Sequence, residues 1–539
     1  MTNLCGVAMS IMRKYVWFWV LSWLMSVGVA MAATVGTADH SKFESLKRPF
    51  KSGPEVTKAC LACHTEAGQQ VMHTSHWTWE YTNPANGQRL GKKTVLNNFC
   101  IATAPNLASC TSCHAGYGWD SAHFDFSKQD NVDCLVCHDT TGKYRKAPGK
   151  AGHPAYQDME FPKGSGKIIK AVDLSAVAQK VGKSSRDNCG ACHFSGGGGD
   201  GVKHGDMDSS LAAPEPNVDV HMDAAGLDFT CATCHKTTAH KVPGSRYAPT
   251  AMDKEKHIRG KPDANPATCQ SCHNSRPHKS TRLNTHANKI ACQTCHIPTI
   301  ARGGVATKLS WDWSTAGKLT PEGKPITKKD AHGHVIYDSR KGDFVVGENV
   351  VPEYLWFNGQ VKYTLIGDKV VKGDKPTQIN RFEGSSTDGK SMIWPVKMFR
   401  GKQPFDPINQ TLLVPHTAGD KGTGYWDNFD WSRALAAGMT AAGAPYSGKF
   451  DFIETEMSWP ITHMVAPKKD ALSCAQCHQP QTGVGRLDKV EGIYMPGRRA
   501  NYWLDLIGWL AAAGTLAGML VHGAIRIYLA RKNPSAGHH

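Results

Sequence analysis

The chain begins with a short apolar run that is flanked as in exported proteins. Residues 15–29 are almost wholly apolar, Arg13 and Lys14 precede them, and the small residues 30–32 follow. A basic start, an apolar middle and a small-residue end are typical of a secretory signal. The run is short for a membrane span of about 20 residues. We therefore predict a signal peptide over residues 1–32, with a permanent N-terminal membrane helix as the alternative.

A second, longer apolar run lies near the other end. Residues 506–525 contain no charged side chain and are interrupted only by His522. At about 1.5 Å per residue, a helix of this length covers a bilayer core of about 30 Å. Tyr502 and Trp503 stand at one end like interface aromatics, and basic residues follow the other end. We predict a transmembrane anchor with a short tail over residues 502–530, which leaves the body on the periplasmic face of the inner membrane; a buried core helix is the alternative.

The stretch 301–473 shows patterns of regular structure between these ends. Residues 354–366 are rich in strand-forming side chains around Asn358 and Gly359, which favours a β-hairpin with a type I′ turn. Residues 432–442 predict a helix that opens at a serine cap. We interpret this stretch as a small β-containing insertion that wraps the rest of the protein.

Composition explains why regular periods are few elsewhere. The 539 residues include 53 Gly and 29 Pro, and only 20% of residues are charged. Such a chain is rich in loops, but its 40% hydrophobic residues exclude a fully disordered protein. The chain is basic, with a formal net charge of +16. Its 18 Cys are too few for a small disulfide scaffold, and their spacing is far from random.

Eight segments share the motif Cys-x-x-Cys-His. Two thiols separated by two residues can each form a thioether with one vinyl group of a single haem, and the next histidine then faces the iron. Zinc sites also use Cys and His, but they do not require a histidine directly after every second cysteine. The motifs therefore predict eight covalently bound haem c groups. The motif residues are Cys60, Cys63 and His64; Cys110, Cys113 and His114; Cys134, Cys137 and His138; Cys189, Cys192 and His193; Cys231, Cys234 and His235; Cys269, Cys272 and His273; Cys292, Cys295 and His296; Cys474, Cys477 and His478.

Eight haems change how the rest of the sequence is interpreted. They bring about sixteen propionates, which the excess positive charge largely neutralises, so the basic composition does not indicate nucleic-acid binding. Porphyrins also supply apolar core, so short helices and loops suffice around them. We expect a mainly α and irregular multihaem cytochrome c fold with a haem-packed core and a C-terminal transmembrane helix. Seven haems fall within residues 33–300 and the eighth within residues 474–500; whether calcium is bound stays open.

A haem that only transfers electrons needs a second strong iron ligand, usually histidine. We set aside the motif histidines and the terminal or membrane residues His40, His522, His538 and His539, and 14 candidates remain among the 26 His. Several lie close to one motif and would more naturally reach the haem of another. An unligated surface histidine is the alternative for each one. We favour His76, His221, His240, His278, His286 and His463, with His204 or His153 completing seven.

Two further segments carry a resemblance to a known family. Cys100 is the cysteine left over once the motifs and Cys5 of the signal are removed, so it has no disulfide partner within the processed chain. It ends the segment 96–100 (LNNFC) before the second motif, and the glycine-rich segment 196–206 follows the fourth. With the order of the motifs and the long gap before the last one, these segments resemble the octahaem tetrathionate reductases over roughly residues 55–480.

The resemblance implies that the haem of the second motif carries Lys203 instead of a distal histidine, and that three more residues lie around it: Asp200, Asn97 and Cys100. Lysine binds iron only as the neutral amine, so burial and the metal must depress its pKa from about 10.4. An incoming substrate displaces such an amine more readily than a buried imidazole. Asp200 then either orients the amine or handles protons, and Cys100 is either a reactive thiolate or a small buried residue.

These features predict a periplasmic, membrane-anchored reductase. The resemblance implies reduction of tetrathionate to thiosulfate, and/or of nitrite and hydroxylamine, at the lysine-ligated haem, with seven bis-histidine haems delivering electrons. The anchor departs from the soluble reductases of the family, so we expect a membrane cytochrome or quinol-oxidising partner as the electron donor. The alternative is a non-catalytic electron conduit between such a partner and soluble carriers.

Overall fold

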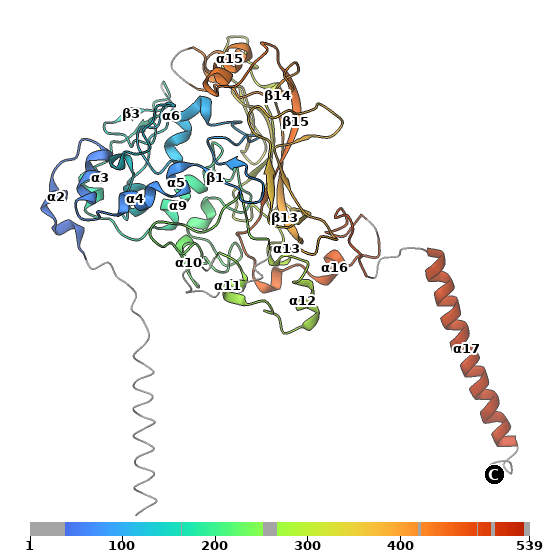
Figure 1. The fold of residues 1–539 in the computed structure, drawn as a ribbon. Helices are drawn as coiled ribbons and strands as arrows, with labels where there is room; N and C mark the ends of the chain where they lie inside the picture. The colour runs from blue at the N-terminus through green and yellow to red at the C-terminus, as the bar shows by residue number, and fades with distance from the viewer. Residues whose placement is uncertain are drawn as a thin grey trace, which may run out of the picture.

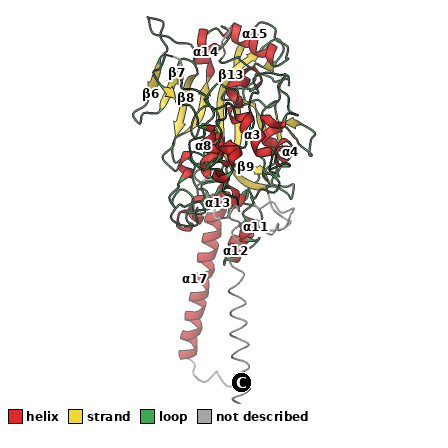
Figure 2. Cartoon of the chain, turned by 90° about the vertical axis from the view of Figure 1, so that its left-hand side faces the viewer, coloured by secondary structure: helices red, strands yellow, loops and turns green. Residues whose placement is uncertain are grey.

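The computed structural model describes residues 38–162, 164–251, 267–418, 422–481, 483–496 and 502–532. The predicted signal peptide lies outside the described residues. The body has two kinds of structure: short helices joined by long loops on one side, and a long-stranded sheet on the other (Figure 1). Figure 2 shows the strands gathered mostly in the upper part of the body.

Each of the eight motifs lies on or beside a short helix. One helical turn holds about 3.6 residues, so cysteines three positions apart lie on the same side of a helix, as attachment to one flat group requires. In α9, the side chains of Ser185 and Asn188 form a capping box that fixes the start of the helix. The helices that carry the motifs are α3 (Gly53–Leu61), α6 (Leu107–Cys110) with η4 (Thr111–Cys113), α7 (Leu135–His138), α9 (Arg186–His193), α10 (Cys231–Cys234), α11 (Gln270–His273), α13 (Cys292–His296) and α16 (Cys474–Cys477).

Further short elements connect the motif helices, and none is longer than six residues. The α-helices are α2 (Glu44–Lys47), α4 (Ala67–Met72), α5 (Ser75–Thr78), α8 (Leu174–Ala178), α12 (Thr281–His286) and α14 (Tyr425–Asn428). The 3₁₀ turns are η2 (His40–Lys42), η3 (Ala104–Asn106), η5 (Gln129–Asn131), η6 (Ser209–Ala212), η7 (Trp313–Thr315) and η8 (Lys468–Asp470). Two small strand pairs join β1 (Tyr81–Thr82) with β2 (Arg89–Leu90), and β3 (Met159–Glu160) with β4 (Ile168–Ile169).

The stretch without motifs forms a mixed sheet that has nine strands within the described residues. Its order is β11-β15-β13-β5-β8-β7-β6, and β9 and β14 also pair with β13. The strands are β5 (Thr307–Asp312), β6 (Thr327–Lys329), β7 (Val335–Asp338), β8 (Gly342–Gly347), β9 (Glu353–Phe357), β11 (Thr377–Gln378), β13 (Met392–Asp406), β14 (Thr411–Leu412) and β15 (Asp451–Pro460). A separate pair joins β10 (Val361–Tyr363) to β12 (Asn380–Phe382). The sheet is more extensive than the small β-containing insertion that we predicted.

The predicted hairpin over residues 354–366 is wrong, although both of its strands form. β9 pairs with β13 and β10 pairs with β12, rather than with each other. The N–H of Asn358 donates to the carbonyl oxygen of Glu383 at 2.8 Å, so the chain turns toward β12. A type I′ turn needs positive φ at both central residues, but only Gly359 has it, at 97°. Strands from distant parts of the sequence therefore outcompete the local turn.

The helix predicted over residues 432–442 forms as α15 (Trp431–Ala441), with a different cap. Asp430 precedes it, and the Asp430 side chain accepts a hydrogen bond from the N–H of Arg433. An aspartate caps as well as a serine, and its charge also favours the positive end of the helix dipole. The predicted serine is instead inside the first turn.

The largest apolar cluster lies on the sheet and includes side chains from both parts of the body. Leu96, Phe99 and Val202 come from the motif-bearing part, and they pack with Phe399 of β13 and Trp459 of β15. Burial of side chains of this size contributes roughly 1.5–3 kcal/mol each. The segments 96–100 and 196–206 therefore pack against the sheet.

α17 (Tyr502–Lys532) contains the predicted transmembrane segment. It has 31 residues, a mean hydropathy of 1.7 in its apolar window, and none of that window is buried. Figure 1 shows it as a single helix apart from the body. Among the described helices, this one is long and apolar enough to cross a membrane.

Candidate functional site

Seven of the eight motif histidines face a second histidine. Two imidazoles that bind one metal from opposite sides place their ring centres about 6 Å apart, because each bonding nitrogen lies about 2 Å from the metal and about 1 Å from its ring centre. All seven distances between ring centres fall between 6.0 and 6.4 Å. The space between each pair therefore fits a metal ion bound by both rings. The pairs are His64 with His40, His138 with His240, His193 with His76, His235 with His463, His273 with His221, His296 with His278, and His478 with His286.

Six of these partners are histidines that the sequence favoured, and the seventh is His40. Its ring lies 6.2 Å from that of His64, although we had set it aside as a terminal residue. His204 packs against a tryptophan and His153 against a tyrosine, so neither predicted seventh partner faces a motif histidine. The missed signal is position, because His40 directly precedes the region of the first motif and begins a short turn capped by Asp39.

Hydrogen bonds orient several of the paired rings. Nδ1 of His138 and Nδ1 of His235 lie 2.7 and 2.9 Å from backbone carbonyl oxygens. Nδ1 of His463 lies 3.2 Å from Oδ2 of the buried Asp206. Because Nδ1 is engaged in each case, Nε2 stays available for a metal ion, which is how a histidine ligand is usually held.

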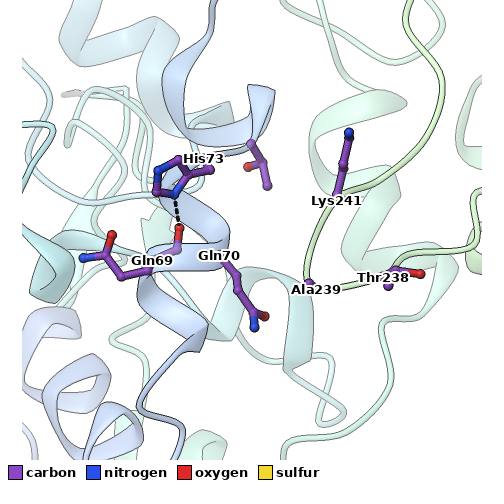
Figure 3. Close-up of a pocket in the computed structure, with 7 residues that line it drawn as sticks. Gln69, Gln70, His73, Thr238, Ala239 and Lys241 are labelled. Carbon is purple, nitrogen blue, oxygen red and sulfur yellow. Dashed lines mark hydrogen bonds between the residues drawn. The ribbon is translucent and has the colours of Figure 1, made fainter. Parts of the chain in front are cut away.

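A cavity of about 370 Å³ lies between α4 and the loop of residues 238–241 (Figure 3). Gln70 lines this cavity, and its Oε1 lies 2.8 Å from Nδ1 of His240. The cavity is lined by Gln69, Gln70, His73, Thr74, Thr238, Ala239 and Lys241.

The motifs are connected in space as one chain with a branch. Cysteines of different motifs lie in hydrogen-bonding contact in four places: Cys60 with Cys134, Cys113 with Cys192, Cys189 with Cys231, and Cys269 with Cys292. Three more pairs are electrostatic neighbours: Cys137 with Cys189, Cys234 with Cys269, and Cys295 with Cys477. The resulting order is first, third, fourth, fifth, sixth, seventh and eighth motif, with the second motif joined to the fourth. Groups attached at these thiols would therefore lie close to one another.

The second motif differs from the other seven. Among the described residues, no second histidine faces His114, whose ring is instead enclosed by five aromatic side chains: Trp77, Trp79, Trp119, Phe124 and Phe126. Burial lowers the pKa of His114 to about 3, which keeps the imidazole neutral as a metal ligand must be. Nε2 of His114 lies 2.7 Å from the carbonyl oxygen of Trp77, so it can bind a metal only after leaving that oxygen.

Lys203 lies near the second motif. Its amine interacts electrostatically with the thiol of Cys113, and its Nζ is 5.3 Å from the ring centre of Trp459. Burial, together with the charges of Arg246 and Lys92, holds the pKa of Lys203 well below its usual range. The neutral amine that results is the form able to bind a metal ion.

Asn97 and Cys100 share one loop beside Lys203. Oδ1 of Asn97 accepts hydrogen bonds from two backbone N–H groups of that loop, at 3.1 and 3.0 Å, so its visible contacts shape the loop. Sγ of Cys100 lies 3.8 Å from the carbonyl oxygen of Gly197, which brings the two loops together. Burial raises the pKa of Cys100 and so favours the thiol over a reactive thiolate.

Asp200 points to a different partner. Its carboxylate accepts hydrogen bonds from the N–H of Ser209, at 2.9 Å, and from the Ser209 hydroxyl. Both oxygens are therefore engaged away from the Lys203 amine. Within the described residues, no hydrogen bond or ion pair joins Asp200 to Lys203.

Two residues of this site were not assigned to it from the sequence. The guanidinium carbon of Arg246 lies 5.0 Å from the ring centre of Trp459, so Arg246 and Lys203 share one indole. Nη2 of Arg246 also donates to the hydroxyl of Tyr247 at 2.6 Å. No motif spacing points to these residues, because Trp459 reaches the site through the pairing of β15 with β13.

Histidine pairs around Cys-x-x-Cys-His helices define a multihaem c-type cytochrome, and comparison with known proteins agrees. Residues 215–297 match the family described as cytochrome c7 and related cytochrome c, and residues 308–481 match the family described as bacterial cytochrome c. The chain is 40% identical to an octahaem cytochrome c of known structure from Shewanella oneidensis, with a TM-score of 0.73, covering 86% of this chain and 98% of that chain. It is also 25% identical over 272 residues to an uncharacterised protein of Archaeoglobus fulgidus, covering 40% of this chain and 90% of that protein. The chain belongs to the octahaem cytochrome c family.

Proposed function

We propose that this protein is a reductase of small oxidised sulfur or nitrogen compounds, with its catalytic centre at the second motif. Cys110, Cys113 and His114 would hold the catalytic haem, and Lys203 would occupy the second axial position as a neutral amine. The seven histidine pairs, including the pair with His40, would hold seven relay haems, giving eight haem c groups. When bound, these groups supply one-electron redox chemistry and, where the distal ligand leaves, a metal position for the substrate.

One observation carries this proposal. Seven motif histidines face another histidine at 6.0 to 6.4 Å, and His114 faces none among the described residues. Two imidazoles close a centre to all but electron transfer. An amine that burial keeps neutral exchanges more readily, so Lys203 would make the second centre the reactive one.

The charge around Lys203 favours an anionic substrate. The cationic side chains of Arg246 and Lys92 lie close enough to lower the pKa of Lys203 through their charge. Tetrathionate and nitrite are anions, whereas hydroxylamine is neutral, so this field favours the first two. Cleavage of the central S–S bond of tetrathionate by two electrons gives two thiosulfate ions and consumes no proton. Because this cleavage needs no proton donor beside Lys203, we infer that tetrathionate is preferred over nitrite.

The electron path would follow the chain of contacting motifs. It ends at the eighth motif on α16, which directly precedes the segment leading to α17. We propose that α17 anchors the body to the inner membrane from the periplasmic side, and that a membrane cytochrome or quinol-oxidising partner delivers electrons. The same chain of contacts is the observation that favours the alternative, a non-catalytic conduit between such a partner and soluble carriers.

Turnover and spectra of the purified holoprotein separate the two functions. With a reduced dye as donor, the reductase consumes tetrathionate, and Lys203→Ala changes the spin state of one haem and alters turnover about 10- to 100-fold. The control Lys372→Ala removes an exposed lysine that pairs with Asp451 and leaves both readouts unchanged. A conduit would consume none of the three substrates. All its haems would be low-spin, and their spectra would not change in Lys203→Ala or on addition of nitrite or cyanide.

A further inference from the structure

Two buried side chains of the sheet hold the backbone of the loop that carries Lys203. The amine of Lys397, on β13, donates to the carbonyl oxygens of residues 202 and 203 at 2.8 and 3.3 Å. The hydroxyl of Thr307, which begins β5, lies 2.6 and 3.2 Å from the carbonyl oxygens of residues 201 and 204. Four consecutive carbonyl oxygens thus face one amine and one hydroxyl. We call Lys397 and Thr307 the carbonyl clamp.

The carbonyl clamp is buried and its donors are satisfied. Lys397 and Thr307 are each only 1% exposed. Nζ of Lys397 also lies 2.6 Å from Oγ1 of Thr307, so the polar contacts of this amine are all with neutral oxygens. Lysine is almost never fully buried, because desolvation of its amine is costly. An apolar side chain of the same length would fill this space without that cost, so the hydrogen bonds themselves point to a role for Lys397.

The side chain of Lys203 contacts the same sheet that holds its backbone, through the strand next to β13. Lys397 of β13 and Trp459 of β15 are direct cross-strand partners. The indole of Trp459 lies under the amine of Lys203, at 5.3 Å from its ring centre. Gly196 lies close to the Lys203 side chain, because a Cβ added to it would come 3.1 Å from the Lys203 Cδ. Backbone and side chain are therefore aligned by one rigid element.

We propose that Lys397 is a positioning residue for Lys203. By fixing the carbonyl oxygens of residues 202 and 203, it would aim the Lys203 amine at the metal position of the second motif and return it there after displacement. Thr307 supports Lys397 from the neighbouring strand. This inference rests on the proposed role of Lys203 as a metal ligand, and it adds a residue from the motif-poor sheet to the catalytic centre.

The test compares Lys397→Met with Lys203→Ala in the full-length holoprotein. Methionine keeps the length and volume of the lysine but donates no hydrogen bond. We expect Lys397→Met to keep its full haem content and its seven bis-histidine signals. The remaining signal, from the haem of the second motif and called here the eighth signal, should broaden or turn partly high-spin. Turnover of tetrathionate should fall about 10- to 100-fold through kcat more than KM, as is typical when the support of a metal ligand is lost. Lys397→Arg should recover part of the signal, and Thr307→Val should cause a smaller change.

Two further variants separate this inference from a general structural effect and from the proposed function. Gln403→Leu removes another buried polar side chain of β13, whose Oε1 accepts from Thr455, and should leave the eighth signal unchanged. In a Lys203→Ala background, Lys397→Met should add nothing to the spectrum. If Lys397→Met and Thr307→Val both leave the eighth signal and kcat as in the parent, the inference is wrong. If Lys203→Ala itself changes no signal, the proposed function fails first. If Lys397→Met loses haem at every centre, the signal of the second-motif haem in Lys397→Arg and Thr307→Val tests the inference instead. An unchanged signal in both variants would then show that the inference is wrong.

Discussion

The two parts of the body are stabilised in different ways. In the sheet, long strands bury large side chains of the polypeptide itself, such as Phe357, Phe399 and Trp313, all fully buried. In the motif-bearing part, short helices leave smaller clusters, such as the one that contains Val56 and Leu174. The first kind of structure carries its own apolar core, whereas the second depends on an apolar group that the motifs attach.

This difference between the sheet and the motif-bearing part bears on how each metal site is supported. The relay pairs are built largely from loops and short helices, which suffice when two imidazoles grip one metal. The second motif lacks such a grip, and the loops with Cys100 and Lys203 both rest on the sheet. Under the proposed function, packing against the sheet would replace a strong ligand at the one centre that exchanges its ligand.

Blocking haem attachment should have the largest effect. In cells unable to attach haem c, we expect the motif-bearing part to remain unfolded, because its core is missing. The sheet keeps its own core, so limited proteolysis should leave a resistant fragment within residues 301–473. Equal digestion of both parts would show that the sheet also depends on haem.

Trp459→Ala should separate stability from function within the sheet. Loss of this buried indole costs about 3–5 kcal/mol of unfolding free energy and leaves Lys203 and Arg246 without their shared support. Trp311→Ala, an equally buried tryptophan of β5, should cost a similar amount without changing the spectrum of the second centre. Denaturant unfolding and electron paramagnetic resonance measure the two effects. Identical spectral changes in both variants would contradict the special place of Trp459.

His40→Ala should change the spin state of one relay haem. Its ring is the partner of His64, so its loss should leave the haem of the first motif with a single protein ligand and turn one bis-histidine signal high-spin. His153→Ala and His204→Ala serve as controls and should keep all bis-histidine signals. A lost relay signal in either control, with none lost in His40→Ala, would reverse the assignment.

The amine of Lys308 should make stability depend on pH. Burial and the charge of Lys341 lower the pKa of Lys308 to about 7, so between about pH 7 and 10 the unfolded chain binds a proton that the folded chain does not. Stability should therefore rise with pH across this window, by at most about 1.4 kcal/mol per unit. Lys308→Met should remove that part of the slope in denaturant titrations. A slope unchanged by the substitution would contradict the lowered pKa.

Arg246→Ala should have the smallest effect. Loss of one cation near Lys203 should raise KM for tetrathionate about fivefold, corresponding to roughly 1 kcal/mol, at low ionic strength. The difference from the parent should shrink in high salt, because salt screens the attraction. KM for hydroxylamine is the control, since a neutral substrate gains nothing from this charge; an equal rise for both substrates would exclude an electrostatic role.

The sequence was sufficient to predict those features that depend on a fixed spacing of neighbouring residues. The Cys-x-x-Cys-His motifs, the apolar run of α17 and the helix α15 could all be read from neighbouring residues. Six of the seven histidines that face motif histidines could also be selected, because they lie near motifs but not within them. His40 was missed because we treated it as a terminal residue, next to the predicted signal peptide.

Long-range pairing is what the sequence could not supply. β9 and β10 have hairpin-like residues, yet each finds its partner in a strand far along the chain. For the same reason, nothing in the spacing of Trp459, Arg246 or Lys397 links them to Lys203. Their contacts arise only once β13, β15 and β5 are side by side.

Magnetic circular dichroism of the oxidised holoprotein, which identifies the axial ligands of each low-spin haem, tests most directly whether one centre is closed by an amine. We predict seven bis-histidine haems and one histidine–amine haem, with only the latter lost in Lys203→Ala. Eight bis-histidine haems, or a histidine–amine signal that survives Lys203→Ala, would contradict the catalytic role of the second motif.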